Sequence, residues 1–535
     1  MPVESSKCRD YESLSSLSNK NGGESPRDQP VLRPISNGKN ATGNLPPQEV
    51  VNLHKREIPF DALPSTTGQT RAEIIVSVSM AAPADDATAD VDRNPGKNEK
   101  RVKKDERLLT ADRWLAHNGH FVTYIGLYLF SILVLFRPYE LIGALSFLSA
   151  TAFYFAMATL LIFLPSQLVT EGNLTMMSTE VKAILAMTAI ALLTIPIAKD
   201  SGIAWDKFND PFIKAVVIFV VLVNVVRTRR RLMGLMWLSF GIGIYLGYMA
   251  LDMYMSGKFA VEAYRVAVDV GGMFGNPNEM ALHFVMMTPI VFALGIATRT
   301  KLLRWTYFAM AAIFVGANMV TFSRGGFLGL LASSAVLAWK MGRKYRLNVT
   351  LASIVIGGIA ILAAPGNYGL RMLSIFIPGL DPVGSSDQRR ELLERSLLVT
   401  ARNPWGIGIG NFPIVGIHNL QSHNAFTQVS AELGILGLVV YLIFMVSPFR
   451  KLGAIERTQF DADDLNWFYY VAIGLQASIV GYMVSSFFAS VAYNWFIYYL
   501  IAYAVAFRRI YSLEQGLKED VVARPMWEWQ PAVAK

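Results

Sequence analysis

The sequence predicts an all-α membrane protein with about 12 transmembrane helices and one large external loop, between the ninth and tenth of them. Three observations predict this fold: an apolar composition, a series of apolar runs of bilayer length, and basic residues in every second loop. Of the 535 residues, 53% are hydrophobic and only 17% are charged. A soluble core of this length cannot bury so much apolar surface, so a bilayer is the expected solvent.

The composition also limits the kinds of partner and site that the chain can have. In a membrane protein, a formal net charge of +9 indicates basic loops that face anionic lipid, so membrane lipid is an expected partner and nucleic acid is not. Cys8 is the only cysteine, which excludes disulfides and thiolate sites in the membrane region. The sequence has no P-loop and no His, Cys and carboxylate set with metal-ligand spacing, so neither a metal nor a cofactor is expected.

Composition along the chain predicts a membrane domain between two tails. Residues 1–105 are rich in Ser, Asn, Gly, Pro, Asp and Lys and show no sustained apolar period, so they are predicted to be a disordered cytoplasmic tail. Residues 106–515 form the predicted polytopic membrane domain, and residues 516–535 form a cytoplasmic C-terminal tail.

Apolar runs of about 17 to 25 residues, the length that spans a bilayer, fill the membrane domain. The predicted spans are residues 120–136, 141–164, 181–198, 211–226, 232–251, 279–298, 305–323, 325–340, 347–365, 432–449, 466–487 and 490–507. The stretch from Leu465 to Phe507 has no charged residue, and its length fits two helices joined by a tight turn.

Basic residues cluster after every second span, as expected for cytoplasmic loops. They follow the fourth, sixth, eighth, tenth and twelfth spans: Arg227 and Arg229–Arg231; Arg299, Lys301 and Arg304; Lys340, Arg343, Lys344 and Arg346; Arg450, Lys451 and Arg457; Arg508 and Arg509. This parity places both termini in the cytoplasm. It places the large loop, residues 366–431, on the outer face, together with the loop at 252–278 and the junction at Ser323–Arg324.

Arg324 lies between two long apolar runs, beside Ser323, Gly325 and Gly326. An arginine at a membrane boundary is costly unless it is solvated or paired. Arg324 is either a snorkelling or turn residue or part of an anion site, since guanidinium binds phosphate with a bidentate fork. The glycines either let a ligand approach the backbone or let helices pack through Gly325-x-x-x-Gly329.

Arg265 lies on the same face, ahead of the turn residues Asn276-Pro277-Asn278. A re-entrant or interfacial loop fits this composition. Taken alone, Arg265 is expected to be a solvated loop charge.

The large loop contains a predicted amphipathic helix that begins at Ser385. This helix would lie along the membrane surface and present Arg389 or Arg390. Its apolar side is expected to carry Leu392, Leu393 and Leu397.

His423 adjoins the entrance to the tenth span on the outer face. In a helix that begins near it, Asn424, Gln428 and Glu432 fall at i, i+4 and i+8 and make a polar stripe beside lipid. The stripe is either in part a structural cap or a functional site at membrane depth. A histidine near its ordinary pKa of about 6.5 is suited to take a proton from a hydroxyl. His418 is a nearby alternative.

Two further features are expected to be structural. His283, within the sixth span, fits a packed contact between helices. Asp461-Ala-Asp463-Asp464 resembles the acidic cluster that holds a metal and a nucleotide sugar in many glycosyltransferases. The charge parity places this cluster in a cytoplasmic loop with no nucleotide-binding domain around it, so a solvated loop is expected.

Several of these pieces, in this order, resemble the O-antigen ligase and O-antigen polymerase superfamily of bacterial membrane glycosyltransferases. The resemblance covers roughly residues 274–442. It rests on Phe-Gly-Asn-Pro-Asn-Glu-Met-Ala at 274–281, Thr-Phe-Ser-Arg-Gly-Gly at 321–326, Arg389 with Leu392, Asn-Pro-Trp-Gly-Ile-Gly-Ile-Gly-Asn-Phe at 403–412, and Ser-His-Asn-Ala-Phe-Thr-Gln-Val-Ser-Ala-Glu-Leu-Gly-Ile-Leu-Gly at 422–437. Upstream, Phe-Arg-Pro-Tyr-Glu at 136–140 is similar to a ligase-like branch of the superfamily.

The resemblance implies an enzyme of the bacterial inner membrane whose large loop is periplasmic. Such an enzyme transfers a glycan from a polyprenyl-diphosphate carrier to a glycan, lipid A-core or protein acceptor, without a metal or a nucleotide. By the resemblance, Arg265 and Arg324 hold the diphosphate and His423 serves the acceptor hydroxyl. Further candidates for supporting roles are Arg389, Asn424, Glu432 and Asn278.

A multi-span transporter or a flippase for lipid-linked glycans is the alternative, because about twelve spans is also a common count for carriers. The sequence argues mildly against it. No repeat relates the two halves of the chain, and the polar groups gather in external loops rather than at mid-span.

Overall fold

The computed structural model describes residues 118–136, 138–141, 145, 151–259, 264–268, 274–343, 347, 351, 368–373, 385–460 and 466–515. These residues belong to one unit of the chain, Asp92–Lys535. The predicted tails at 1–105 and 516–535 and the acidic cluster at 461–464 lie outside the described residues. The ninth predicted span, 347–365, also lies outside them apart from its residues 347 and 351.

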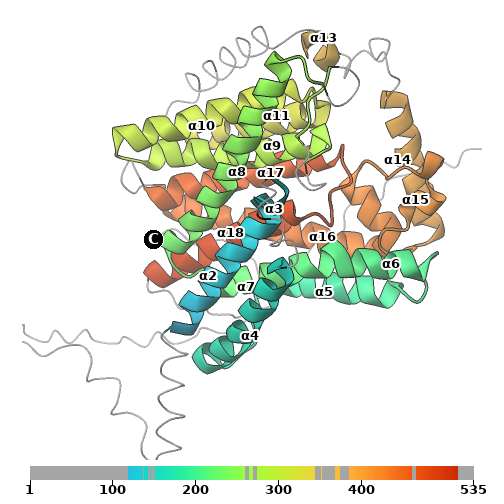
Figure 1. The fold of residues 1–535 in the computed structure, drawn as a ribbon, viewed down its shortest axis with the longest axis horizontal. Helices are drawn as coiled ribbons and strands as arrows, with labels where there is room; N and C mark the ends of the chain where they lie inside the picture. Colours follow the sequence, from blue (N-terminus) through green and yellow to red (C-terminus); the bar gives the residue numbers. More distant parts are fainter. Residues whose placement is uncertain are drawn as a thin grey trace, which may run out of the picture. The chain divides into compact units, whose positions relative to one another are not determined.

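Every element in the described part of the chain is a helix, which confirms the all-α prediction (Figure 1). In chain order the elements are α2 (His120–Ser131), η2 (Ile132–Phe136), α3 (Pro138–Leu141), α4 (Thr151–Glu171), α5 (Thr179–Thr194), α6 (Ser201–Lys207), η4 (Phe208–Phe212), α7 (Ile213–Val225), α8 (Arg229–Met255), α9 (Pro277–Ala297), α10 (Lys301–Val320), α11 (Arg324–Met341), α13 (Tyr368–Leu373), α14 (Ser385–Arg402), α15 (Phe412–Val415), η6 (Ile417–Asn419), α16 (Ala425–Thr458), α17 (Trp467–Ser486) and α18 (Trp495–Glu514).

Seven helical stretches among the described residues are long and apolar enough to cross a membrane. They are Tyr154–Glu171, Ser201–Val225, Arg229–Met255, Pro277–Ala297, Lys301–Val320, Ala425–Thr458 and Trp467–Ser486. The count of about 12 spans therefore stays a prediction. The uncharged stretch from Leu465 to Phe507 does form two helices, α17 and α18, joined by the turn at 487–494.

Polar capped helical segments precede two of the predicted spans. The fourth predicted span, 211–226, agrees with α7 (Ile213–Val225), but α6 precedes it from Ser201, where the Asp200 carboxylate accepts from the backbone N–H of Gly202 and Ile203, and a non-helical Asp210 separates the two. The tenth was 432–449, yet α16 begins at Ala425 with the Asn424 side chain as its cap. The apolar run alone does not reveal these polar first turns.

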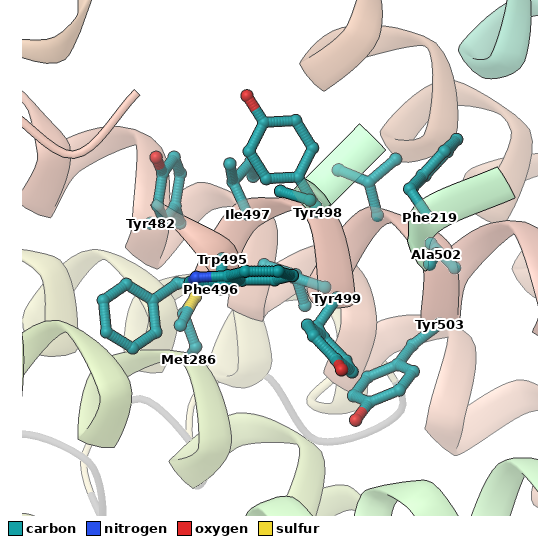
Figure 2. Packing of buried hydrophobic residues seen from close by; sticks show 14 of the residues in the cluster. Phe219, Met286, Tyr482, Trp495, Phe496, Ile497, Tyr498, Tyr499, Ala502 and Tyr503 are labelled. Carbon is teal, nitrogen blue, oxygen red and sulfur yellow. The ribbon is translucent and has the colours of Figure 1, made fainter. Parts of the chain in front are cut away.

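Helix α18 lies deep in the core. Every residue from Trp495 to Phe507 is buried, and α18 packs against α7, α8, α16 and α17. Figure 2 shows its aromatic side chains packed with Phe219 of α7, Met286 of α9 and Tyr482 of α17. The tyrosine hydroxyls in this core have polar partners: Tyr499 pairs with Ser131 at 2.9 Å and Tyr503 with Ser239 at 2.8 Å.

Large apolar side chains also cover the outward faces of the helices. Leu161 is 74% exposed, Leu193 73% and Leu302 80%. In water such positions would be costly, whereas against lipid tails they cost nothing.

The basic residues that alternate with the spans gather at one end of the helices, here called the basic end, where they surround buried carboxylates. Glu180 of α5 is fully buried and binds Arg508 of α18 at 2.9 Å and Lys451 of α16 at 3.2 Å. Glu456 is likewise buried between Lys340 and Arg343. These basic residues thus hold the bundle together, a role that charge parity alone does not predict.

We expect Glu180→Ala to destabilise the protein by about 3–5 kcal/mol, because it removes a carboxylate from two buried or half-buried cations. Unfolding of the full chain in detergent, measured by titration with a denaturing surfactant, tests this. Glu394→Ala is the matched control: Glu394 pairs with Arg390 at 3.2 Å on the surface of α14, and losing it should cost under about 1 kcal/mol. Equal losses from both substitutions would contradict the assignment.

Candidate functional site

Arg265 and Arg324 lie at the opposite end of the helices, here called the site end, where α9, α11, α16 and α18 begin and α10 and α17 stop. Arg265 donates from Nε to the Thr321 carbonyl at 3.0 Å and from Nη2 to Asn278 Oδ1 at 3.0 Å. Ser323 Oγ donates to the same Asn278 oxygen at 2.8 Å. One amide oxygen therefore ties the segment of Arg265 to the junction that carries Arg324.

Local capping explains how Asn278 and Ser323 reach these positions. The Asn276 side chain caps α9 by accepting from the Asn278 N–H at 2.9 Å, and Pro277 occupies the first turn, where a missing N–H costs nothing. The Ser323 hydroxyl caps α11 by accepting from the Gly326 N–H at 3.1 Å.

Arg265 is 5% exposed and Arg324 is 7% exposed. The expectation that Arg265 is a solvated loop charge is wrong, because neighbouring carbonyl and amide oxygens take the place of water. Arg324 is the first residue of α11, where the helix dipole adds to the positive potential.

Of the two interpretations of the Gly325-Gly326 pair, the structure supports helix packing. A Cβ on Gly325 would lie 2.9 Å from the Cβ of Phe488, and one on Gly329 would lie 2.8 Å from the Gly481 carbonyl oxygen. Glycine at these positions lets α11 pack closely against α17 and the turn that follows it.

A third arginine, Arg371 of α13, lies in this region, and no sequence motif indicates it. Its Nε donates to the Phe322 carbonyl at 2.9 Å, and its guanidinium carbon lies 4.9 Å from the centre of the Tyr264 ring. Phe322 itself has a left-handed φ of 50°. Arg371 stands in a part of the large loop with no recognisable motif, so no signal in the sequence distinguishes it from other loop arginines.

His423 lies just ahead of α16, held by its backbone. Its N–H donates to Ser490 Oγ at 2.8 Å, and its φ is 51°, which histidine tolerates better than most side chains. The side chain is partly buried, and this burial, together with the nearby positive charge of Arg389, lowers the pKa of His423 below its ordinary value. The imidazole is therefore neutral near pH 7 and able to accept a proton.

Asn424 and Glu432 have structural contacts. Asn424 Oδ1 accepts from the N–H of Phe426 and Thr427, so the cap interpretation of this part of the polar stripe is confirmed. Glu432 is fully buried and accepts from the Phe412 N–H at 3.3 Å. The expectation that the stripe faces lipid is wrong, since Asn424, Gln428 and Glu432 are all buried.

The glycine-rich stretch at 403–412 docks on α16 where that helix is interrupted. Ile407 N–H donates to Ala431 O at 3.0 Å, Gly408 N–H to Glu432 O at 2.9 Å, and Ile435 N–H to Pro404 O at 3.0 Å. Gly434 has φ 75° and ψ −177°, a conformation open in practice to glycine alone. The interruption frees backbone groups of α16 for this pairing.

Helix α14 covers this docked stretch. Leu392 and Val399 are buried against Ile407, Phe412 and Ala431. Leu397 is 54% exposed, so placing it on the same side as Leu392 is wrong: the buried face follows Leu392, Ser396 and Val399, at i, i+4 and i+7. Of the two candidate arginines, Arg390 is an exposed partner of Glu394, whereas Arg389 lies near His423.

The turn at 487–494 links the junction that carries Arg324 to His423. Phe488 packs on Gly325, beside Arg324, and Ser490 holds the His423 N–H. The turn is itself fixed, because the hydroxyl of Tyr482 donates to the Val491 carbonyl at 3.2 Å and that of Tyr498 to the Ala492 carbonyl at 3.0 Å. Ser490 is thus a further site residue that the sequence analysis missed, hidden in an apolar stretch.

Two other histidines among the described residues, His283 and His418, fit other roles. His283 is buried against Phe274 and Phe496, as the sequence analysis expected of a packed residue. His418 lies in η6 with a φ of 54°. Within the described ranges, no group of three His, Cys, Asp or Glu residues is placed to hold a metal ion.

Residues 308–442 match the family model described as O-Antigen ligase. The match runs from α10 into α16 and contains Arg324, Arg389 and His423, whereas Arg265 and Asn278 precede it. It confirms the resemblance to the O-antigen ligase and polymerase superfamily. A comparison with curated protein sequences gives no match. The chain thus combines apolar helices long enough to cross a membrane several times with a segment that matches the O-antigen ligase family.

We expect Gly434→Ala to destabilise the docked stretch, because alanine adopts this backbone conformation at a cost of about 1–3 kcal/mol. Its Cβ would also lie 2.4 Å from the Pro404 carbonyl oxygen. A lowered unfolding midpoint in detergent and faster proteolysis within 403–412 are the expected results. Gly241→Ala, inside α8 with open space around it, should leave both unchanged or raise the midpoint. Identical behaviour of the two variants would argue against the docking role of Gly434.

Proposed function

We propose that the protein transfers a glycan from a polyprenyl-diphosphate carrier to an acceptor hydroxyl, in the manner of an O-antigen ligase or polysaccharide polymerase. The observation that carries the proposal is the joining of Arg265 to the Arg324 junction through Asn278, with His423 tied by Ser490 to the turn that packs beside that junction. The O-antigen ligase match over 308–442 supports the same class of reaction.

In this proposal Arg265 and Arg324 bind the diphosphate. A sugar diphosphate is a good leaving group once its charge is neutralised, and preorganised cations stabilise the charge that develops as the bond to the sugar breaks. Their low exposure strengthens the interaction, since water competes less for the phosphate oxygens. The polyprenyl tail then needs only a lipid-facing groove.

His423 acts as the general base. The acceptor hydroxyl gives its proton to the imidazole as its oxygen attacks the anomeric carbon, the bond from that carbon to the phosphate oxygen breaks, and the polyprenyl diphosphate leaves. A single displacement of this kind inverts the anomeric configuration. Arg389 tunes His423, whereas Asn278, Asn424 and Glu432 position the groups around it.

We place the site end on the periplasmic face of the bacterial inner membrane and the basic end, with both termini, in the cytoplasm. The concentration of basic residues at the basic end supports this orientation, since cytoplasmic loops are rich in lysine and arginine. A glycan, lipid A-core or a protein fits as the acceptor.

Replacement of His423, Arg265 and Arg324 by alanine, one at a time, should abolish most of the transfer activity. The expected loss is about 10²–10⁴-fold for His423→Ala and about 10²–10³-fold for each arginine. The assay uses purified full-length protein in detergent with a lipid-linked glycan donor and measures product per time. Arg390→Ala, one residue from Arg389 but exposed, is the control and should retain activity. Unaffected transfer in all three variants would contradict the mechanism.

Arg389→Gln should shift the acidic limb of the pH profile of transfer toward higher pH. The positive charge of Arg389 lowers the pKa of His423, so removing it raises that pKa, and the imidazole then becomes neutral only at higher pH. The measurement is kcat/KM against pH. Arg390→Gln should leave the limb in place, and an unmoved limb in an active Arg389→Gln enzyme would contradict the pairing of Arg389 with His423.

A further inference from the structure

A second polar site lies far from the first, at the basic end. A pocket of about 530 Å³ opens between α11, α16 and α17. Its lining residues are Lys340, Arg343, Phe449, Arg450, Lys451, Gly453, Ala454, Glu456, Arg457 and Gln476. Five of these side chains are basic and one is acidic, so the pocket is a concentrated positive region rather than a balanced ionic network.

The ion pairs at this end leave Arg450 and Arg457 as the cations best placed to take a ligand. Glu456 is matched by Lys340 and Arg343, and Lys451 by Glu180. Arg450 is exposed and makes no ion pair with any described residue, and Arg457 binds only a neutral acceptor there, the Gly453 carbonyl at 3.1 Å. Two guanidinium groups thus border the pocket without a carboxylate of the described chain against them.

Several features suit this pocket to a lipid headgroup. It is lined by the basic end of one candidate membrane span, Ala425–Thr458, and by Gln476 in the middle of a second, Trp467–Ser486. At the same end Trp339, next to Lys340, is 63% exposed and Trp305 is 68% exposed, and exposed tryptophan is typical of the membrane–water interface. Phe449 and Ala454 add apolar wall, which suits a ligand with an attached hydrocarbon part better than a free ion.

We propose that this pocket binds the headgroup of an anionic glycerophospholipid of the phosphatidylglycerol type. The phosphate lies against Arg450 and Arg457, since guanidinium matches phosphate oxygens geometrically. The headgroup also carries hydroxyl donors, and the pocket offers an acceptor for them: Gln476 Oε1 is buried and has no hydrogen-bond partner among the described residues. A basic pocket between helices on the cytoplasmic side is a recurrent way to bind such lipids.

The test is lipid binding by the purified full chain, with native mass spectrometry in detergent to count bound lipids. Phosphatidylglycerol is titrated against the wild type, Arg450→Gln, Arg457→Gln and the double variant. Each single substitution should weaken binding about fivefold and the double substitution about 30-fold. Arg299→Gln is the matched control: it removes an exposed arginine from the same end but outside the pocket, and it should leave the affinity unchanged.

Three results would overturn the proposal. Equal weakening by Arg299→Gln would mean diffuse attraction to the whole basic end. Equal binding of zwitterionic phosphatidylcholine would mean that the pocket does not distinguish the net negative charge of the headgroup. Displacement of the lipid by inorganic phosphate at concentrations comparable to its own would mean a free-phosphate site. The proposal is supported if the wild type binds phosphatidylglycerol and only the pocket variants bind it more weakly.

Discussion

The turn between α17 and α18 is the constraint on which the site depends. Two buried tyrosine hydroxyls, from Tyr482 and Tyr498, donate to its carbonyl groups, and the deeply buried helix α18 begins directly after it. From this fixed position the turn reaches the α11 start through Phe488 and the α16 start through Ser490. Residues that belong to separate helices, far apart in the chain, are therefore placed by one short segment of core. This is how a site made of loop residues gains the rigidity of the bundle beneath it.

The sequence was enough to predict the helical class, the junction at Ser323–Arg324 and the pairing of α17 with α18, because apolar length and charge breaks are local properties. It was also enough to choose Arg265, Arg324 and His423 as candidates. It could not predict that Arg265 is buried, since the oxygens that surround it come from Thr321 and Asn278. Nor could it identify Ser490 or Arg371, whose positions follow only from packing. The interruption of α16 at Gly434 was hidden for the same reason: its partner, the stretch at 403–412, is distant in sequence.

Arginines serve two different purposes at the two ends. At the basic end, Arg343 and Arg508 bind buried carboxylates. These ion pairs neutralise both partners and connect neighbouring helices. At the site end, Arg265 and Arg371 donate to backbone carbonyl and amide oxygens, which orient their guanidinium groups. Arginine is thus a partner of buried carboxylates at the basic end, whereas in the proposed mechanism Arg265 binds an anion at the site end.

The Glu180 cluster has a consequence for synthesis of the chain. Glu180 precedes Lys451 by 271 residues and Arg508 by 328 residues. At about 5–20 residues per second, the ribosome needs roughly a quarter of a minute to a minute to make the last partner. During that interval the carboxyl group of α5 must stay hydrated or protonated, because lipid does not accept it charged and alone. The ion cluster can therefore form completely only after synthesis has passed Arg508 of α18.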